Sequence, residues 1–97
     1  MNLSLFEGRK VLVSGGVIEL GRKQYLENLN LGRYAARGVD IFIIVKRINK
    51  KALQKGFLSQ CGDASRVYYA SSLKKAMRIY KNIKMRGDVV LFENDIP

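Results

Sequence analysis

The sequence predicts a Rossmann-like α/β domain with about four mainly parallel strands and helices packed on the sheet. Short apolar runs bounded by glycine or polar residues alternate with longer segments whose apolar residues recur every three or four positions. This alternation gives the order β-α-β-α-β-α-β, which favours a parallel sheet with right-handed crossovers. The 97 residues, 47% of them hydrophobic, are enough for a single domain with one core, and we expect residues 1–97 to form it.

Four segments have the pattern of a strand. Residues 9–14 (RKVLVS) form a short apolar run between glycines, and residues 39–45 (VDIFIIV) are apolar almost throughout, as expected of a strand covered on both faces. Residues 66–70 (RVYYA) and 89–92 (VVLF) are the third and fourth predicted strands.

Three helices are predicted between these strands. In residues 22–37 the inward face is expected to hold Tyr25, Leu29, Gly32 and Ala36. A second helix fits residues 50–60, with Ala52, Leu53 and Phe57 inward. Ser71 or Ser72 can cap a third helix, whose apolar stripe Leu73, Ala76, Met77, Tyr80 and Ile83 is the clearest amphipathic pattern of the chain.

Composition narrows the possible functions. The chain has no histidine, so a Ser-His-Asp triad, a Cys-His pair or a zinc site is excluded, and one cysteine permits no internal disulfide. No stretch is long and apolar enough to span a bilayer and the start lacks the pattern of a signal peptide, so we expect a cytoplasmic protein with no membrane partner. The net charge of +10 indicates an anionic partner, such as a phosphorylated substrate, an anionic surface or nucleic acid.

The stretch GGVIELGRK, after the first predicted strand, is close to a nucleotide-binding P-loop. A P-loop needs Lys and then Ser or Thr after its second glycine, whereas Gly21 is followed by Arg22 and Lys23. The residues between Gly16 and Gly21 are bulky, and Glu19 is acidic, which does not suit a loop that wraps a polyphosphate. We therefore interpret the match as coincidental.

Cations gather where the predicted strands end and the helices begin. In a parallel sheet this edge binds ligands, and residues 15–21, 46–51, 70–75 and 93–97 should meet there. The cations are Arg22 with Lys23, Lys46 with Arg47, Lys50 with Lys51, and Lys74 with Lys75. Positive charge in a first helical turn opposes the helix dipole, at a cost of a few tenths to about 1 kcal/mol each. The edge either faces an anion or carries solvated lysines, and the sequence leaves both interpretations open.

The motifs, in their order, resemble the carboxyl-terminal domain of the Mur ligase family. The resemblance rests on VSGGVIELGRKQYLENLNLGRYAA followed by VDIFIIV, then on SSLKKAM, GDVVLFENDIP and the spacing between them, and it runs from about residue 6 to the last residue. The chain is similar to the UDP-N-acetylmuramoyl-tripeptide D-alanyl-D-alanine ligase type and to related Mur-like ligases. From this resemblance we expect residues 1–97 to correspond to most of that domain without its first strand and helix.

The resemblance implies a part of an ATP-dependent amide ligase of peptidoglycan precursor synthesis. In that family the central domain binds ATP and magnesium, and a UDP-linked muramoyl peptide is joined to an amino acid or dipeptide. The carboxyl-terminal domain closes the site, so this chain would need the central domain as its partner and would have no cofactor, catalytic residue or metal ligand of its own.

The resemblance and the basic edge together give the candidate site residues. Arg22, Lys23, Lys46 and Arg47 are expected to contact an anion or nucleotide. Gly15, Gly16 and Glu19 would shape the first substrate loop, and Glu93, Asn94 and Asp95 are candidates for the incoming amine. Dipeptide-adding enzymes usually read Gly-Asp-Met and Lys-Gly-Ser at these two places, so the amine substrate stays open.

Two other hypotheses remain. A small basic nucleic-acid-binding α/β domain would explain the +10 charge and the line of Lys74, Arg78 and Lys81 along one helix. An inert fragment, lacking a first strand, would expose a sheet edge that tends to pair with another copy.

Overall fold

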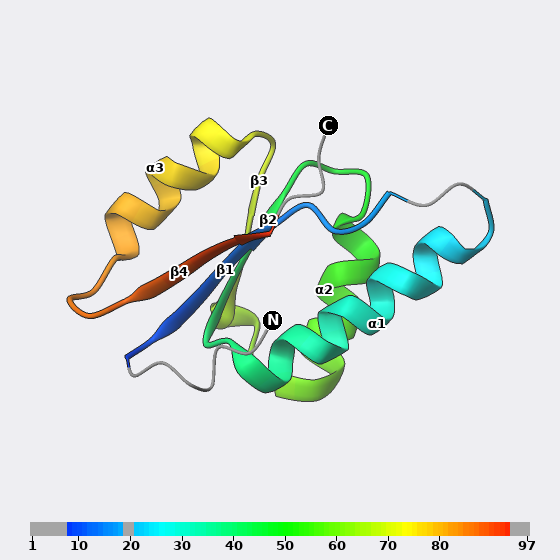
Figure 1. Cartoon of the computed structure of the whole chain (residues 1–97), viewed down its shortest axis with the longest axis horizontal. Coiled ribbons are helices and arrows are strands. Elements are labelled where there is room, and N and C mark those ends of the chain that lie inside the picture. Colours follow the sequence, from blue (N-terminus) through cyan, green and yellow to red (C-terminus); the bar gives the residue numbers. More distant parts are fainter. Residues whose placement is uncertain (1–7, 19–20, 94–97) are drawn as a thin grey trace.

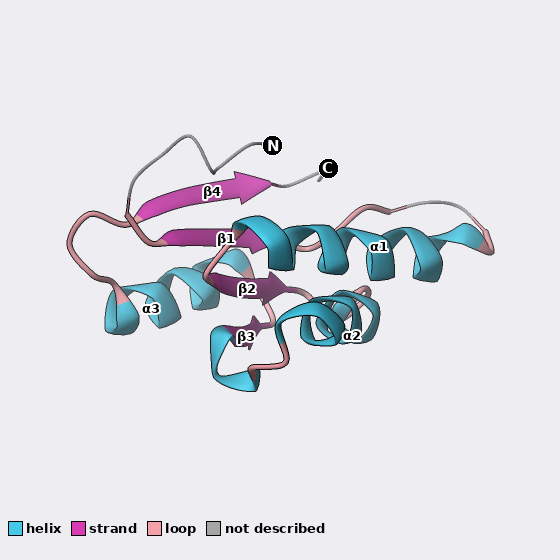
Figure 2. Cartoon of the chain, turned by 90° about the horizontal axis from the view of Figure 1, so that it is seen from below, coloured by secondary structure: helices cyan, strands magenta, loops and turns pink. Residues whose placement is uncertain are grey.

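A computed structural model describes residues 8–18 and 21–93. It contains one sheet of four parallel strands in the order β3-β2-β1-β4, with helices on both faces (Figures 1 and 2). The predicted fold class and the order of elements are therefore confirmed. The central strands β1 (Lys10–Ser14) and β2 (Ile41–Val45) are almost entirely buried, and β3 (Val67–Ala70) and β4 (Val89–Glu93) flank them.

The helices lie close to their predicted positions. α1 spans Lys23–Gly38, α2 spans Lys50–Cys61 and α3 spans Leu73–Ile83. A short 3-10 turn, Ala64–Arg66, precedes β3. Ser72 rather than Ser71 caps α3, because its hydroxyl accepts a hydrogen bond from the Lys75 N–H at 3.2 Å.

The two faces of the sheet carry separate apolar clusters. α1 and α2 cover one face, where Leu53 and Phe57 pack with Leu12, Phe42 and Ile44 of the central strands. α3 covers the opposite face, where Ala76 packs with side chains that include Val11, Val13 and Ile43. Because neighbouring residues of a strand point to opposite faces, a strand covered on both must be apolar at every position, as β2 is.

The predicted inward face of α1 is wrong by part of a turn. Tyr25 is 50% exposed, whereas Asn28, Gly32 and Ala35 are buried. The helix turns this small and polar side inward because α1 packs directly on α2 as well as on the sheet. The predicted inward residues of α2, Ala52, Leu53 and Phe57, are buried as expected.

Glycines allow the two helices to approach closely. A Cβ at Gly32 would collide with the Leu53 carbonyl oxygen and lie 2.9 Å from the Phe57 nitrogen, and one at Gly56 would collide with the Leu29 carbonyl oxygen. The backbones of α1 and α2 are therefore in contact here, with no room for side chains between them.

We predict that Gly32→Ala destabilises the fold by about 1 to 3 kcal/mol, because the methyl group forces the two helices apart. Gly38→Ala, at the end of the same helix, has nothing within 4 Å of the added Cβ and is the matched control. This control should be neutral or stabilising by up to about 1 kcal/mol. Thermal unfolding of both variants tests the helix contact, and equal melting temperatures would contradict it.

A buried carboxylate joins β1, α3 and β4 on the α3 side of the sheet. Asp88, with a side chain only 2% exposed, accepts from Arg9 Nε (3.0 Å) and Nη2 (2.9 Å), from the Tyr80 hydroxyl (2.8 Å) and from the Met85 N–H (3.0 Å). Arg9 also donates to the Ile83 carbonyl at 2.8 Å. These bonds, led by those from Arg9, lower the pKa of Asp88 from 3.8 to about 2.

This pKa predicts how stability depends on pH. The difference between 3.8 and about 2 corresponds to about 2 kcal/mol of folding free energy, present above about pH 4 and lost as pH falls towards 2. Asp88→Asn should lower stability near neutral pH by about 2 kcal/mol and remove this part of the acid dependence. Denaturant unfolding between pH 2 and about 7 measures both effects. If the free energy of unfolding falls with decreasing pH in the same way for both proteins, the proposed role of Asp88 is refuted.

Candidate functional site

The carboxyl ends of the four parallel strands lie along one edge of the sheet, as predicted. The loop after β1, the turn between β2 and α2, the start of α3 and Glu93 meet at this edge, and Glu93 is opposite Ser14 in the strand register. Glu19, Asn94 and Asp95 lie outside the described residues. Gly15, Gly16, Lys46 and Arg47 all lie at the edge, and Arg22 and Lys23 lie at the start of α1.

Two buried asparagine side chains fix the loop after β1. Asn28 of α1 accepts from the Val17 N–H at 2.8 Å and donates to the carbonyl oxygens of Val17 and Gln24, both at 2.8 Å. Asn49, at the start of α2, donates to the carbonyl oxygens of Gly15 (3.0 Å) and Val17 (3.2 Å). Asn49 in turn accepts from Gln24 Nε2 at 2.9 Å. The loop is therefore bonded to both helices at once.

Two backbone amides of this loop, those of Gly16 and Val17, already have partners within the protein. The Gly16 N–H donates to the Ser14 hydroxyl at 3.0 Å, and the Val17 N–H donates to Asn28. Gly16 has φ +79°, and a Cβ there would collide with the Asn28 side-chain oxygen, so glycine is needed at this position. A P-loop holds phosphate with free amides of this kind. The described part of the loop consequently does not have the geometry of a phosphate cradle.

We predict that Asn28→Asp destabilises the protein by about 2 to 4 kcal/mol. The substitution keeps the shape but replaces two donors with a charged oxygen that faces the carbonyls of Val17 and Gln24. Asn30→Asp, at an exposed position of the same helix, is the control and should change stability by less than about 0.5 kcal/mol. Chemical unfolding of the two variants checks this, and similar losses would argue against a structural role for Asn28.

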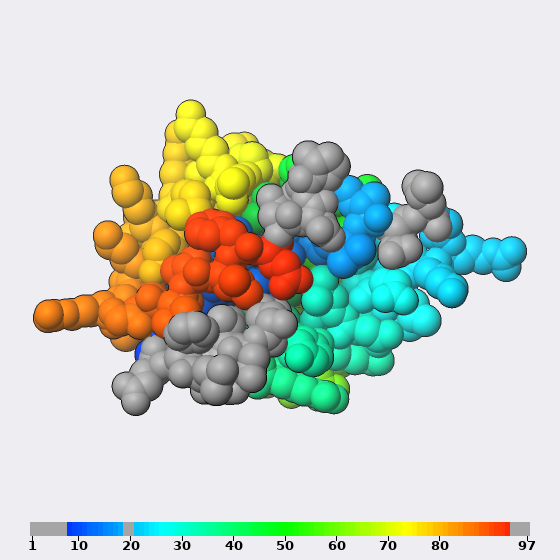
Figure 3. Space-filling model, in the orientation of Figure 1, coloured from blue at the N-terminus to red at the C-terminus, as the bar shows by residue number. Residues whose placement is uncertain are grey.

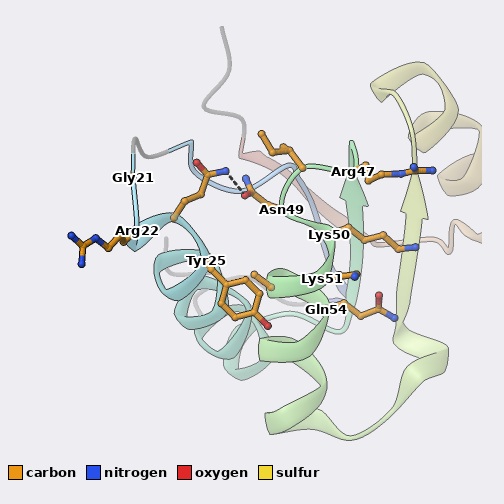
Figure 4. A pocket seen from close by; sticks show the side chains of 11 residues that line it. Gly21, Arg22, Tyr25, Arg47, Asn49, Lys50, Lys51 and Gln54 are labelled. Atoms are coloured by element: carbon orange, nitrogen blue, oxygen red, sulfur yellow. Dashed lines mark hydrogen bonds between the residues drawn. The ribbon is translucent and has the colours of Figure 1, made fainter.

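A pocket of about 940 Å³ opens between the starts of α1 and α2 (Figure 4). Its lining includes Gly21, Arg22, Gln24 and Tyr25 at the start of α1. Around the start of α2 it includes the cations Arg47, Lys50 and Lys51. None of the described residues that line it is acidic. Neither helix start has a side-chain cap, because Arg22 does not cap α1 and Asn49 uses its side chain on the loop. Positive side chains and uncapped helix amides thus occur together in the described structure.

The predicted cations surround this pocket without converging on one point. In Figure 4 Arg22 points away from α2, whereas Arg47 and Lys50 extend towards β3. The Lys50 ammonium lies 4.5 Å from the centre of the Tyr69 ring, a cation–π contact. Lys23 and Lys46 are exposed and lie outside the pocket lining, and Lys46 has the left-handed φ of 70° at the end of β2.

The residues missed by the sequence reasoning are Gln24, Asn28 and Asn49, which bind to one another or to the same loop. Asn28 could have been noticed from its spacing, because Asn28, Gly32 and Ala35 define a narrow helix face of small or polar residues. Asn49 carries no such signal, since asparagine before a helix is usually read as a cap.

The described residues show no cluster of three or more histidine, cysteine or carboxylate side chains that could bind a metal ion. Among them, no helix is both long and apolar enough to cross a membrane.

The structure defines an α/β domain of the Rossmann type with a basic pocket between the starts of α1 and α2. One solved structure with this fold is MurF, a Mur ligase from Acinetobacter baumannii, to which the chain is similar with a TM-score of 0.72 and 21% sequence identity. The alignment covers 95% of this chain and 20% of that MurF chain. No protein-family model matches the sequence, and no curated protein matches it either.

Proposed function

We propose that this chain is the carboxyl-terminal domain, or most of it, of an ATP-dependent Mur-type amide ligase of peptidoglycan precursor synthesis. The observation that carries the proposal is the fold, which matches one fifth of a MurF chain along almost the whole of this one. The order of the sequence motifs independently indicates the same family. At 21% identity the fold likeness does not by itself define the activity, so the two lines are needed together.

In this proposal the chain closes the ligase site and does not catalyse alone. The central domain of such a ligase would supply the P-loop, ATP and magnesium, and the substrates would be a UDP-linked muramoyl peptide and an amino acid or dipeptide. The site would be cytoplasmic. The absence of histidine and the internally bonded loop after β1 both support a domain that depends on catalytic groups from elsewhere.

The loop geometry restricts how an anion would be held. Because the Gly16 and Val17 amides are occupied, phosphate contacts would come from side chains at the helix starts. Arg22 and Arg47 line the pocket and are the first candidates, with Lys23 and Lys46 beside it. Gly15, Gly16 and Glu19 would act by shaping the loop. Glu93, Asn94 and Asp95 stay candidate contacts for the incoming amine.

The hypothesis of a nucleic-acid-binding domain gains nothing from the fold comparison. We keep it only as the alternative explanation of the charge.

Nucleotide titration tests the anion site. Adding a non-hydrolysable ATP analogue should shift the amide NMR signals of Gly21, Lys23 and Lys50 more than those of Gly16 and Val17, whose amides are bonded internally. Arg22→Gln with Arg47→Gln should weaken binding about tenfold or more, whereas Arg33→Gln with Arg37→Gln, a matched change on the far part of α1, should not. Equal weakening by both pairs would show that only net charge matters.

Reconstitution tests the ligase role separately. The chain is added to a Mur-type ligase that lacks its carboxyl-terminal domain, and amide formation is measured with ATP, magnesium and the muramoyl peptide. We expect activity only when both parts are present. A sequence upstream of the first codon that encodes no ligase domain, combined with no restored activity, would contradict the proposal.

A further inference from the structure

α3 and the turn after it carry a concentrated positive charge that the proposed ligase role does not use. Six cations, here called the α3 cationic strip, are all exposed: Lys74, Lys75, Arg78, Lys81, Lys84 and Arg86. No acidic residue occurs between positions 73 and 86. The side chains of this segment protrude from one side of the molecule, in yellow and orange in Figure 3.

Three cations of the strip lie on the outermost line of the helix. Lys74, Arg78 and Lys81 have the i, i+4, i+7 spacing of one helix face. At 100° per residue this line is opposite Ala76 and Ile83, which pack against the sheet. The strip therefore points away from the domain, along the full length of α3.

This arrangement is unfavourable for an isolated helix. Lys74 and Arg78 repel each other at i, i+4, and Lys74 and Lys75 lie in the first turn, where cations oppose the helix dipole. In the described parts of the chain the one salt bridge joins Arg9 to Asp88, so no acidic side chain there neutralises the strip. A partner with dense negative charge would relieve this repulsion.

Two exposed apolar side chains frame the strip. Leu73 begins α3 and is 46% exposed, and Met85 follows its end and is 60% exposed. Leu73 precedes the first cation of the strip, and Met85 lies between its last two, Lys84 and Arg86. Cations with apolar side chains beside them suit a bilayer surface, where the charges meet phosphate headgroups and the apolar groups enter the boundary of the acyl region.

We propose that the α3 cationic strip binds the surface of a bilayer that contains anionic phospholipids. A peripheral contact of this kind with a bilayer needs no membrane-spanning segment. A nucleic-acid backbone fits the strip less well, because it offers no apolar region that the exposed side chains of Leu73 and Met85 could enter. The strip also offers no exposed aromatic ring for bases, since Tyr80, the one aromatic residue of α3, is half-buried and its hydroxyl is bound to Asp88.

Vesicle co-sedimentation tests the proposal with a charge-matched pair of variants. The vesicles contain phosphatidylglycerol and phosphatidylcholine in equal parts. K74Q/R78Q/K81Q removes three charges from the strip, and R33Q/R37Q/K55Q removes three exposed charges from α1 and α2, on the other face of the sheet. At about 0.1 M salt the first variant should bind roughly 100-fold more weakly than the unmodified chain, and the second less than about fivefold more weakly. Circular dichroism of both variants checks that they fold.

A tryptophan reporter separates lipid contact from charge alone. The chain has no tryptophan, so Met85→Trp places a single probe at the end of the strip. Its fluorescence should shift to the blue with the mixed vesicles, and Tyr34→Trp, on exposed α1, should show no shift. With a DNA duplex neither reporter should shift to the blue.

Three results would overturn the proposal. The first is equal loss of vesicle binding in the two charge variants, and the second is an unshifted Met85→Trp spectrum on vesicles that do bind the protein. The third is strip-dependent binding to duplex DNA at about 0.15 M salt without vesicle binding, which would assign the strip to nucleic acid.

Discussion

The hydrogen bonds from Asn28 and Asn49 to the loop after β1 are the constraint on which the candidate site depends. Buried backbone polar groups must be paired, and here helix side chains pair those of Gly15 and Val17. Because Asn28 belongs to α1 and Asn49 begins α2, the same bonds set the relative position of the two helix starts. The basic pocket lies between these starts, so its shape follows from the loop.

This constraint indicates that Gly16 and Val17 of the P-loop-like stretch have a structural role and do not bind phosphate through their backbone. Gly16 serves close packing, since it leaves room for the Asn28 side chain. The Gly16 and Val17 amides are bonded inside the protein. The positive charge stands instead on side chains at the helix starts, where it can act on an anion brought by another domain. This division between a rigid loop and exposed cations agrees with a domain that closes a site whose catalytic groups are elsewhere.

The strands and helices could be predicted because each has a clear apolar period, as in the uninterrupted strand β2. The inward face of α1 could not, because it depends on contact with α2 through Gly32 and on the polar side chain of Asn28. The edge where the cations gather was predictable from parallel topology. Which cations line the pocket could not be predicted, because side-chain positions depend on contacts between distant residues. Lys50, for example, lies over the ring of Tyr69, 19 positions away.

The central claim is that the loop after β1 is an internally bonded scaffold, and hydrogen exchange of its amides tests it most directly. The Gly16 and Val17 amides should exchange as slowly as those of β1 and β2, because the Gly16 bond to Ser14 is buried and the Val17 bond to Asn28 opens only when α1 moves away from the loop. Saturating phosphate should leave these rates unchanged. Rapid exchange that phosphate slows would contradict the account and restore the loop as a phosphate-binding element.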